Sequence, residues 1–80
     1  MKIQHEWGRM QLEFCKATFA QNVKQRRNAL GFTQKALAEK IGMSLRGFQD
    51  LEAGKNSPSI EIACKLATVF NCKLDELCTL

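Results

Sequence analysis

The segment from Ser44 to Lys55 carries side chains whose chemistry suits the edges of base pairs. The guanidinium of Arg46 can bond to O6 and N7 of one guanine. Leu45 can contact only an apolar group, and the thymine methyl is the one that a DNA groove offers. Asp50 lies four residues after Arg46, so on a helix its carboxylate could accept from cytosine N4 or pair with Arg46. We favour the pair, in which Asp50 orients the guanidinium.

Each of these side chains also has a plain structural interpretation. Leu45 could fold back into the core, and Arg46 with Asp50 could be a surface ion pair that stabilises the helix by about 0.3 kcal/mol. Gly47 either loosens this segment and allows a close approach to a DNA backbone, or is merely a tolerated exposed glycine.

Glycine and serine between residues 33 and 53 predict two helices with a sharp corner. A single helix would hold Gly42 and Gly47 in its interior, at about 1 kcal/mol each relative to alanine. A turn at Gly42 removes one of these costs, because glycine adopts positive φ freely, and Ser44 can then cap the next helix. The small Ala38 lets the two helices cross closely. This pattern predicts a helix-turn-helix, with its helices at about 34–41 and 45–53.

The same signals predict three further helices, whereas strand signals are nearly absent. A helix from about 18 to 30, with a stripe of Phe19, Val23 and Leu30, ends at Gly31. A fourth helix, about 58 to 70, begins with Ser57 as N-cap and Pro58 at its first position. It is expected to bury these residues: Ile60, Ala63, Leu66, Ala67 and Phe70. A short helix follows "NCK". The fold class is therefore all-α.

Residues 1–17 are predicted to form a helical N-terminal extension to a domain of residues 18–80. Their apolar stripe consists of Ile3, Trp7, Met10 and Phe14. It is out of phase with the stripe that follows, so the helix should kink or restart near Ala17 and Thr18. The stripe could pack on the domain, join a second copy or be mobile. We favour packing or dimerisation, because an exposed Trp and Phe together promote association.

From about Phe19 to Leu77 the sequence resembles the Cro/C1-type, or Xre-like, helix-turn-helix domain of phage repressors and bacterial regulators. The resemblance is carried by three stretches: "TQKALAEKIGMS", "FQDLEAGKNSPS" and "KLATVFNCKLDEL". It implies a five-helix, lambda-repressor-like domain whose third helix enters the major groove, usually as a homodimer on a palindromic operator in double-stranded DNA. The function expected from it is sequence-specific transcriptional regulation, most often repression.

Site residues follow from the same resemblance, position by position. Four residues would face base edges: Ser44, Leu45, Arg46 and Asp50. Three would contact phosphates: Gln34, Lys35 and Lys55. Without the resemblance, Gln34 would be taken for a solvated first-turn residue.

A buried ion pair is also implied by the resemblance. Arg27 of the first helix would pair with Glu52 at the end of the recognition helix and hold that helix in place. Arg26 is the neighbouring candidate for this pair.

Departures from the family pattern concern the thiols and the helix caps. Cys64, Cys72 and Cys78 stand where relatives carry Leu or Val, and we interpret them as reduced thiols that pack as small hydrophobes. Lys35 and Ala36 stand where acidic residues are frequent, so the glutamate of a capping box is absent.

Composition narrows the classes of function. The chain has 80 residues and a net charge of +4, with the basic excess between residues 24 and 55, which favours a polyanion surface. A single histidine and the absence of a CxxC pair argue against a zinc site, and we expect no cofactor. No phosphate-binding glycine loop or nucleophile with its base suggests an enzyme.

We expect a cytoplasmic protein with no membrane span. The alternative function is a protein-interaction module, antitoxin-like or coactivator-like.

Overall fold

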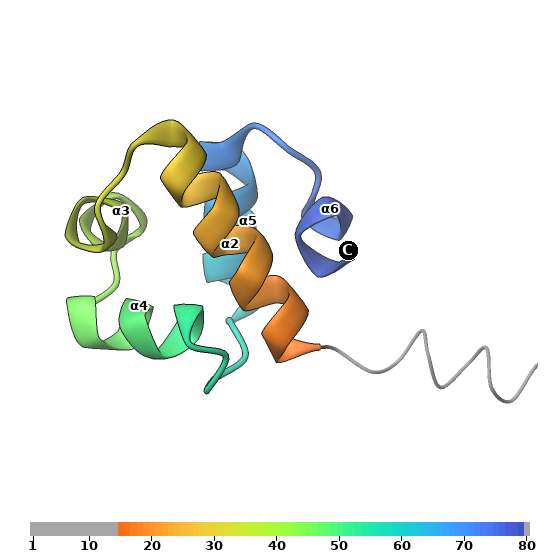
Figure 1. Cartoon of the computed structure of the whole chain (residues 1–80), viewed down its shortest axis with the longest axis horizontal. Coiled ribbons are helices and arrows are strands. Elements are labelled where there is room, and N and C mark those ends of the chain that lie inside the picture. The colour runs from red at the N-terminus through yellow and green to blue at the C-terminus, as the bar shows by residue number, and fades with distance from the viewer. Residues whose placement is uncertain (1–14, 80) are drawn as a thin grey trace, which may run out of the picture.

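The computed structural model describes residues 15–79, and within them it shows five helices and no strand. The helices are α2 (Lys16–Leu30), α3 (Gln34–Ile41), α4 (Leu45–Glu52), α5 (Ile60–Phe70) and α6 (Leu74–Cys78). In Figure 1, α2 crosses in front of α5, with α3 and α4 on one side of the pair and α6 on the other. The predicted all-α, five-helix fold is confirmed. None of the described helices has the length and apolarity that a bilayer span requires.

The corner between α3 and α4 is built as the sequence predicted. Gly42 ends α3 with φ +77°, and its N–H donates to the carbonyls of the last turn. The Ser44 hydroxyl accepts from the Gly47 N–H at 3.0 Å and so caps α4. Thr33 caps α3 in the same way, through the Ala36 N–H. Ala38, the small residue expected to permit a close crossing, is 1% exposed and belongs to the core.

The start of α5 differs from the prediction. The N-cap is Ser59, whose hydroxyl accepts from the Ile62 N–H, and not Ser57, so Pro58 precedes the helix. Ile60 was expected in the core but is 72% exposed. It lies six residues before the buried Leu66, which on a helix turns it by about 120° from the core stripe.

The buried face of α2 also differs in one residue. Phe19 and Val23 are in the core as predicted, whereas Leu30 is 54% exposed. The third member of the stripe is Arg27, at i+8 from Phe19, and it is buried. The helix begins at Lys16, two residues before the expected start. The stripe of residues 3–14 lies outside the described residues, so the division into 1–17 and 18–80 stays a prediction.

Substitution of the corner glycine should destabilise the fold. In Gly42→Ala a Cβ would meet only the Lys65 amine, at 3.7 Å, so its cost comes from the positive φ, about 1–2 kcal/mol. Gly47→Ala is the control, because Gly47 has no positive φ and is inside α4. Its helix-propensity gain of about 1 kcal/mol is opposed by a Cβ 3.0 Å from the Ser44 hydroxyl. Urea unfolding should therefore show a lower midpoint for Gly42→Ala than for Gly47→Ala. Equal midpoints would contradict the left-handed corner.

Candidate nucleic-acid interface

Helix α4 has one buried face and one exposed face. Phe48 and Leu51 are 0% and 2% exposed and anchor the helix on the core. Leu45, Arg46 and Gln49 are exposed on the other side. Leu45 is 41% exposed, so the interpretation that placed it in the core is wrong. We call Leu45, Arg46, Gln49 and Asp50 the outward face of α4.

Asp50 lies between two cations on this outward face. Its Oδ1 is 3.6 Å from Arg46 Nε and 3.9 Å from Lys55 Nζ. The Arg46–Asp50 pair was predicted, and the Lys55 contact was not. Both distances exceed those of a charge-assisted hydrogen bond, and the Arg46 side chain is 84% exposed. The guanidinium is therefore held loosely and remains available to a ligand.

A buried ion pair locks the position of α4. Arg27 Nε donates to Glu52 Oε2 at 2.8 Å, and Arg27 Nη2 donates to Glu52 Oε1 at 3.1 Å. The two side chains are 11% and 3% exposed. Arg27 Nη1 also donates to the Phe32 carbonyl at 2.8 Å, so one guanidinium ties α2 to the loop before α3 and to α4. Arg26, the neighbouring candidate, instead pairs with Glu76 of α6 at 3.5 Å.

Gln34 also forms a hydrogen bond with this ion pair. Its Nε2 donates to Glu52 Oε1 at 2.7 Å, and its Oε1 accepts from Gln49 Nε2 at 3.4 Å. The side chain is therefore neither simply solvated nor pointed away as a free phosphate ligand. Its backbone N–H, in the first turn of α3, is the group that would suit an anion. Lys35, beside it, is exposed.

Gln49 is the residue of this interface that the sequence analysis missed. It lies one helical turn after Leu45, and that spacing alone could have placed it on the same face. Ser44, by contrast, uses its hydroxyl oxygen as the helix cap. Its O–H remains as a donor, so its role at a base edge stays a prediction.

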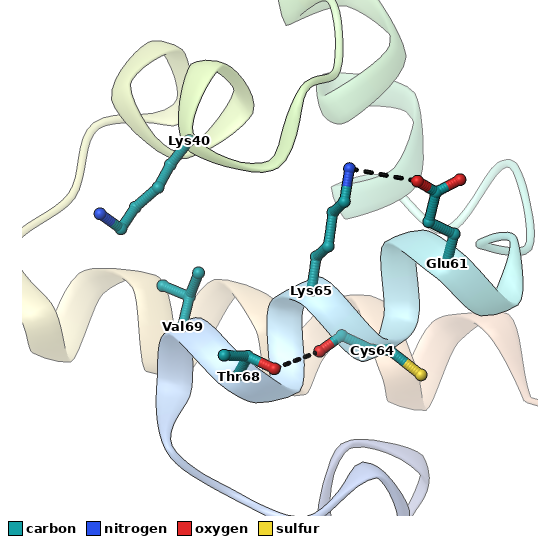
Figure 2. Close-up of a pocket in the computed structure, with 6 residues that line it drawn as sticks. All are labelled: Lys40, Glu61, Cys64, Lys65, Thr68 and Val69. Carbon is teal, nitrogen blue, oxygen red and sulfur yellow. Dashed lines mark hydrogen bonds and ion pairs between the residues drawn. The ribbon is translucent and has the colours of Figure 1, made fainter.

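A hollow lies between α3 and α5, and none of the predicted site residues lines it. Figure 2 shows Lys40 on one side and the Lys65–Glu61 ion pair, 3.3 Å long, on the other. The Thr68 hydroxyl donates to the Cys64 carbonyl at 2.9 Å. The residues that line this hollow are Lys40, Glu61, Cys64, Lys65, Thr68 and Val69.

The thiols are not packed as predicted. Cys64 and Cys78 are exposed, and only Cys72, half-buried, packs against the core. A hydrogen bond from the Thr18 hydroxyl lowers the pKa of Cys15, whereas partial burial raises the pKa values of Cys72 and Cys78. Among residues 15–79 no three His, Cys, Asp or Glu side chains are grouped as metal ligands.

Comparison with known proteins places this arrangement in context. A family model described as helix-turn-helix matches residues 23–77. An HTH-type transcriptional regulator of Archaeoglobus fulgidus is 38% identical over 55 residues, which span 69% of this chain and 79% of the relative. The transcriptional repressor RstR of a cryptic phage in Vibrio cholerae is 33% identical over 58 residues, or 72% of this chain and 52% of the repressor.

A solved structure also matches. The restriction-modification controller protein C.AhdI from Aeromonas hydrophila superposes with a TM-score of 0.71 and 29% sequence identity. The match covers 78% of this chain and 94% of that protein.

Proposed function

This chain belongs to the helix-turn-helix family, and from that premise we propose that it is a sequence-specific DNA-binding transcriptional regulator. It acts in the cytoplasm as a homodimeric repressor on a palindromic operator. Helix α4 lies in the major groove, and the first turn of α3 and the loop after α4 lie on the phosphate backbone. The named transcriptional regulators among its relatives support the regulatory role, and RstR supports repression.

One observation carries this proposal. The outward face of α4 holds groups that can bond to base edges, while the opposite face is fixed by the core and by the Arg27–Glu52 pair. A recognition surface needs both properties, because polar groups on a mobile helix would have to be ordered on binding, at a cost in conformational entropy. Lys55, 67% exposed at the end of this helix, adds a positive charge where a phosphate would lie.

Two alanine variants, one of an arginine and one of a lysine, test the proposal. Arg46→Ala should remove about 1–3 kcal/mol of discrimination at one base pair, because its bidentate bond to guanine is lost. Lys55→Ala should weaken binding to all sequences alike and reduce the slope of log affinity against log salt by about 1. Fluorescence anisotropy with duplexes over a salt series measures both effects. If the two variants behaved identically on matched and mismatched duplexes, the assigned roles would be wrong.

The same titration separates this proposal from a protein-interaction module. A DNA-binding regulator loses affinity steeply as salt rises, because counterions are released from the duplex when it binds. A protein-interaction module would bind every duplex with a dissociation constant weaker than about 10⁻⁵ M, even at low salt. That result would contradict the proposed DNA-binding function.

A further inference from the structure

Gln49 and Gln34 form a chain of amides that runs from the buried ion pair to the outward face of α4. We propose that Gln49 reads a base edge, with a preference for adenine, and that Gln34 is the positioning residue that orients its amide. The inference rests on the proposed DNA-binding function and adds to it one base position and the way in which it is read.

The chain of amides starts at a group that can only accept. The Glu52 carboxylate, 3% exposed, receives two bonds from Arg27 and one from Gln34. An ionised carboxylate has no hydrogen to donate, so the side chain of Gln34 must present its NH₂ group to it. The 2.7 Å contact between Gln34 Nε2 and Glu52 Oε1 therefore fixes which way the Gln34 amide faces.

The orientation then passes to Gln49. With its nitrogen bonded to Glu52, Gln34 turns its oxygen toward Gln49, and a carbonyl oxygen can only accept. Gln49 must therefore donate from its own NH₂ group, and its Nε2 lies 3.4 Å from Gln34 Oε1. The two glutamines come from different helices, so the relation exists only in the folded chain.

What remains free on Gln49 matches one base. One N–H of Gln49 is used by Gln34, which leaves the second N–H as a donor and Oε1 as an acceptor on an exposed residue. Adenine presents the N7 acceptor and the N6 donor side by side in the major groove, and glutamine can bond to both. Guanine offers two acceptors there, so the oriented amide can satisfy only one of them.

Neighbouring residues leave room for this contact. Arg46 lies three residues earlier on the same helix, so Gln49 and Arg46 can address adjacent positions of a site. Ala53, four residues after Gln49, is exposed and small, and the two residues line one open hollow together with Gln34.

Selection of bound duplexes from a random pool, with the enriched sequences counted, tests the inference on the full chain. Gln49→Ala should lower the adenine preference at one position of each half-site by about 5- to 100-fold, with the other positions unchanged. Gln34→Leu should lower the same preference, because it removes the hydrogen bond that orients the Gln49 amide, while the backbone N–H of residue 34 stays in place. Gln25→Ala, an exposed glutamine of α2, is the matched control and should change no preference.

Four outcomes would overturn all or part of the inference. A uniform loss of affinity in Gln49→Ala, without a change of preference, would make Gln49 a phosphate contact and overturn it. An unchanged preference in Gln34→Leu, with Gln49→Ala as expected, would overturn the positioning role. If the wild-type chain enriched a site that Gln49→Ala selected equally well, only this inference would fail. If the wild-type chain enriched nothing, the proposed function would fail first and the inference with it.

Discussion

Arg27→Ala is expected to lower the free energy of unfolding by about 3–5 kcal/mol, because it breaks a buried ion pair by removing one partner. Its removal leaves the Glu52 carboxylate, 3% exposed, with the hydrogen bond that Gln34 donates but without the opposite charge. A buried charge without its partner keeps the cost of desolvation and loses the attraction that offset it. The link from Arg27 to the Phe32 carbonyl is lost as well. Urea unfolding followed by circular dichroism measures the change.

Arg26→Ala is the matched control for this prediction. Arg26 is the next residue on α2 and also makes an ion pair, but its side chain is 36% exposed and its contact with Glu76 is 3.5 Å long. Exposed pairs contribute about 0–1 kcal/mol, so its unfolding midpoint should move little. If the two alanine variants shifted the urea midpoint equally, the Arg27–Glu52 pair would not be the contact that fixes α4 on the domain. If Arg27→Ala did not fold at all, the conservative Arg27→Lys would give a smaller, measurable loss, because one ammonium cannot replace the forked guanidinium.

Phe48→Ala should cost about 3–5 kcal/mol of stability, and Leu45→Ala, three residues away on the same helix, should cost about 0.5 kcal/mol or less. Phe48 is fully buried, so its truncation leaves a cavity in the core. Leu45 is 41% exposed and lies on the outward face. The expected effect of Leu45→Ala is instead on DNA: a lost preference for thymine, because its methyl contact is removed.

Unfolding and duplex binding, measured on both variants, form the test. A large loss of stability in Leu45→Ala would place Leu45 in the core and contradict the assignment of the two faces of α4. Where Phe48→Ala is too unstable to purify, Phe48→Leu keeps most of the volume and should show an intermediate loss.

The helices and their corner could be predicted because the signals that set them are local. Gly42 and Ser44 define the corner by positive φ and by a capping hydroxyl, and neither depends on distant residues. The start of α5 was missed because serines stand on both sides of Pro58 and both can cap. The hydroxyl of Ser59 makes the capping bond, to the Ile62 N–H, and the composition of the segment does not distinguish it from Ser57.

The core stripe of α2 was assigned wrongly at one position because that position holds a buried arginine. Arg27 occupies the periodic position after Phe19 and Val23, and a charged residue there makes the stripe look interrupted, so Leu30 was chosen in its place. The partner of Arg27 was predicted only from the resemblance to a family. Periodicity could not have found it, because Glu52 lies 25 residues away on another helix.

The hydrogen bonds that join Gln49, Gln34 and Glu52 could not be predicted from the sequence. Gln34 and Gln49 lie 15 residues apart, and their bond depends on the angle at which α3 and α4 cross. The Lys55 contact with Asp50 has a similar origin, because it depends on how the chain turns after Glu52. Local patterns place a residue on a face, whereas the fold decides which neighbour it meets there.

The measurement that tests the central claim most directly is selection of bound sites from random double-stranded DNA by the wild-type chain. A homodimer that reads the major groove with α4 should enrich a palindrome whose half-sites lie about 10 base pairs apart, with guanine among the preferred bases. Enrichment of no sequence, with every duplex bound more weakly than about 10⁻⁵ M at low salt, would contradict the assignment of α4 as a recognition helix.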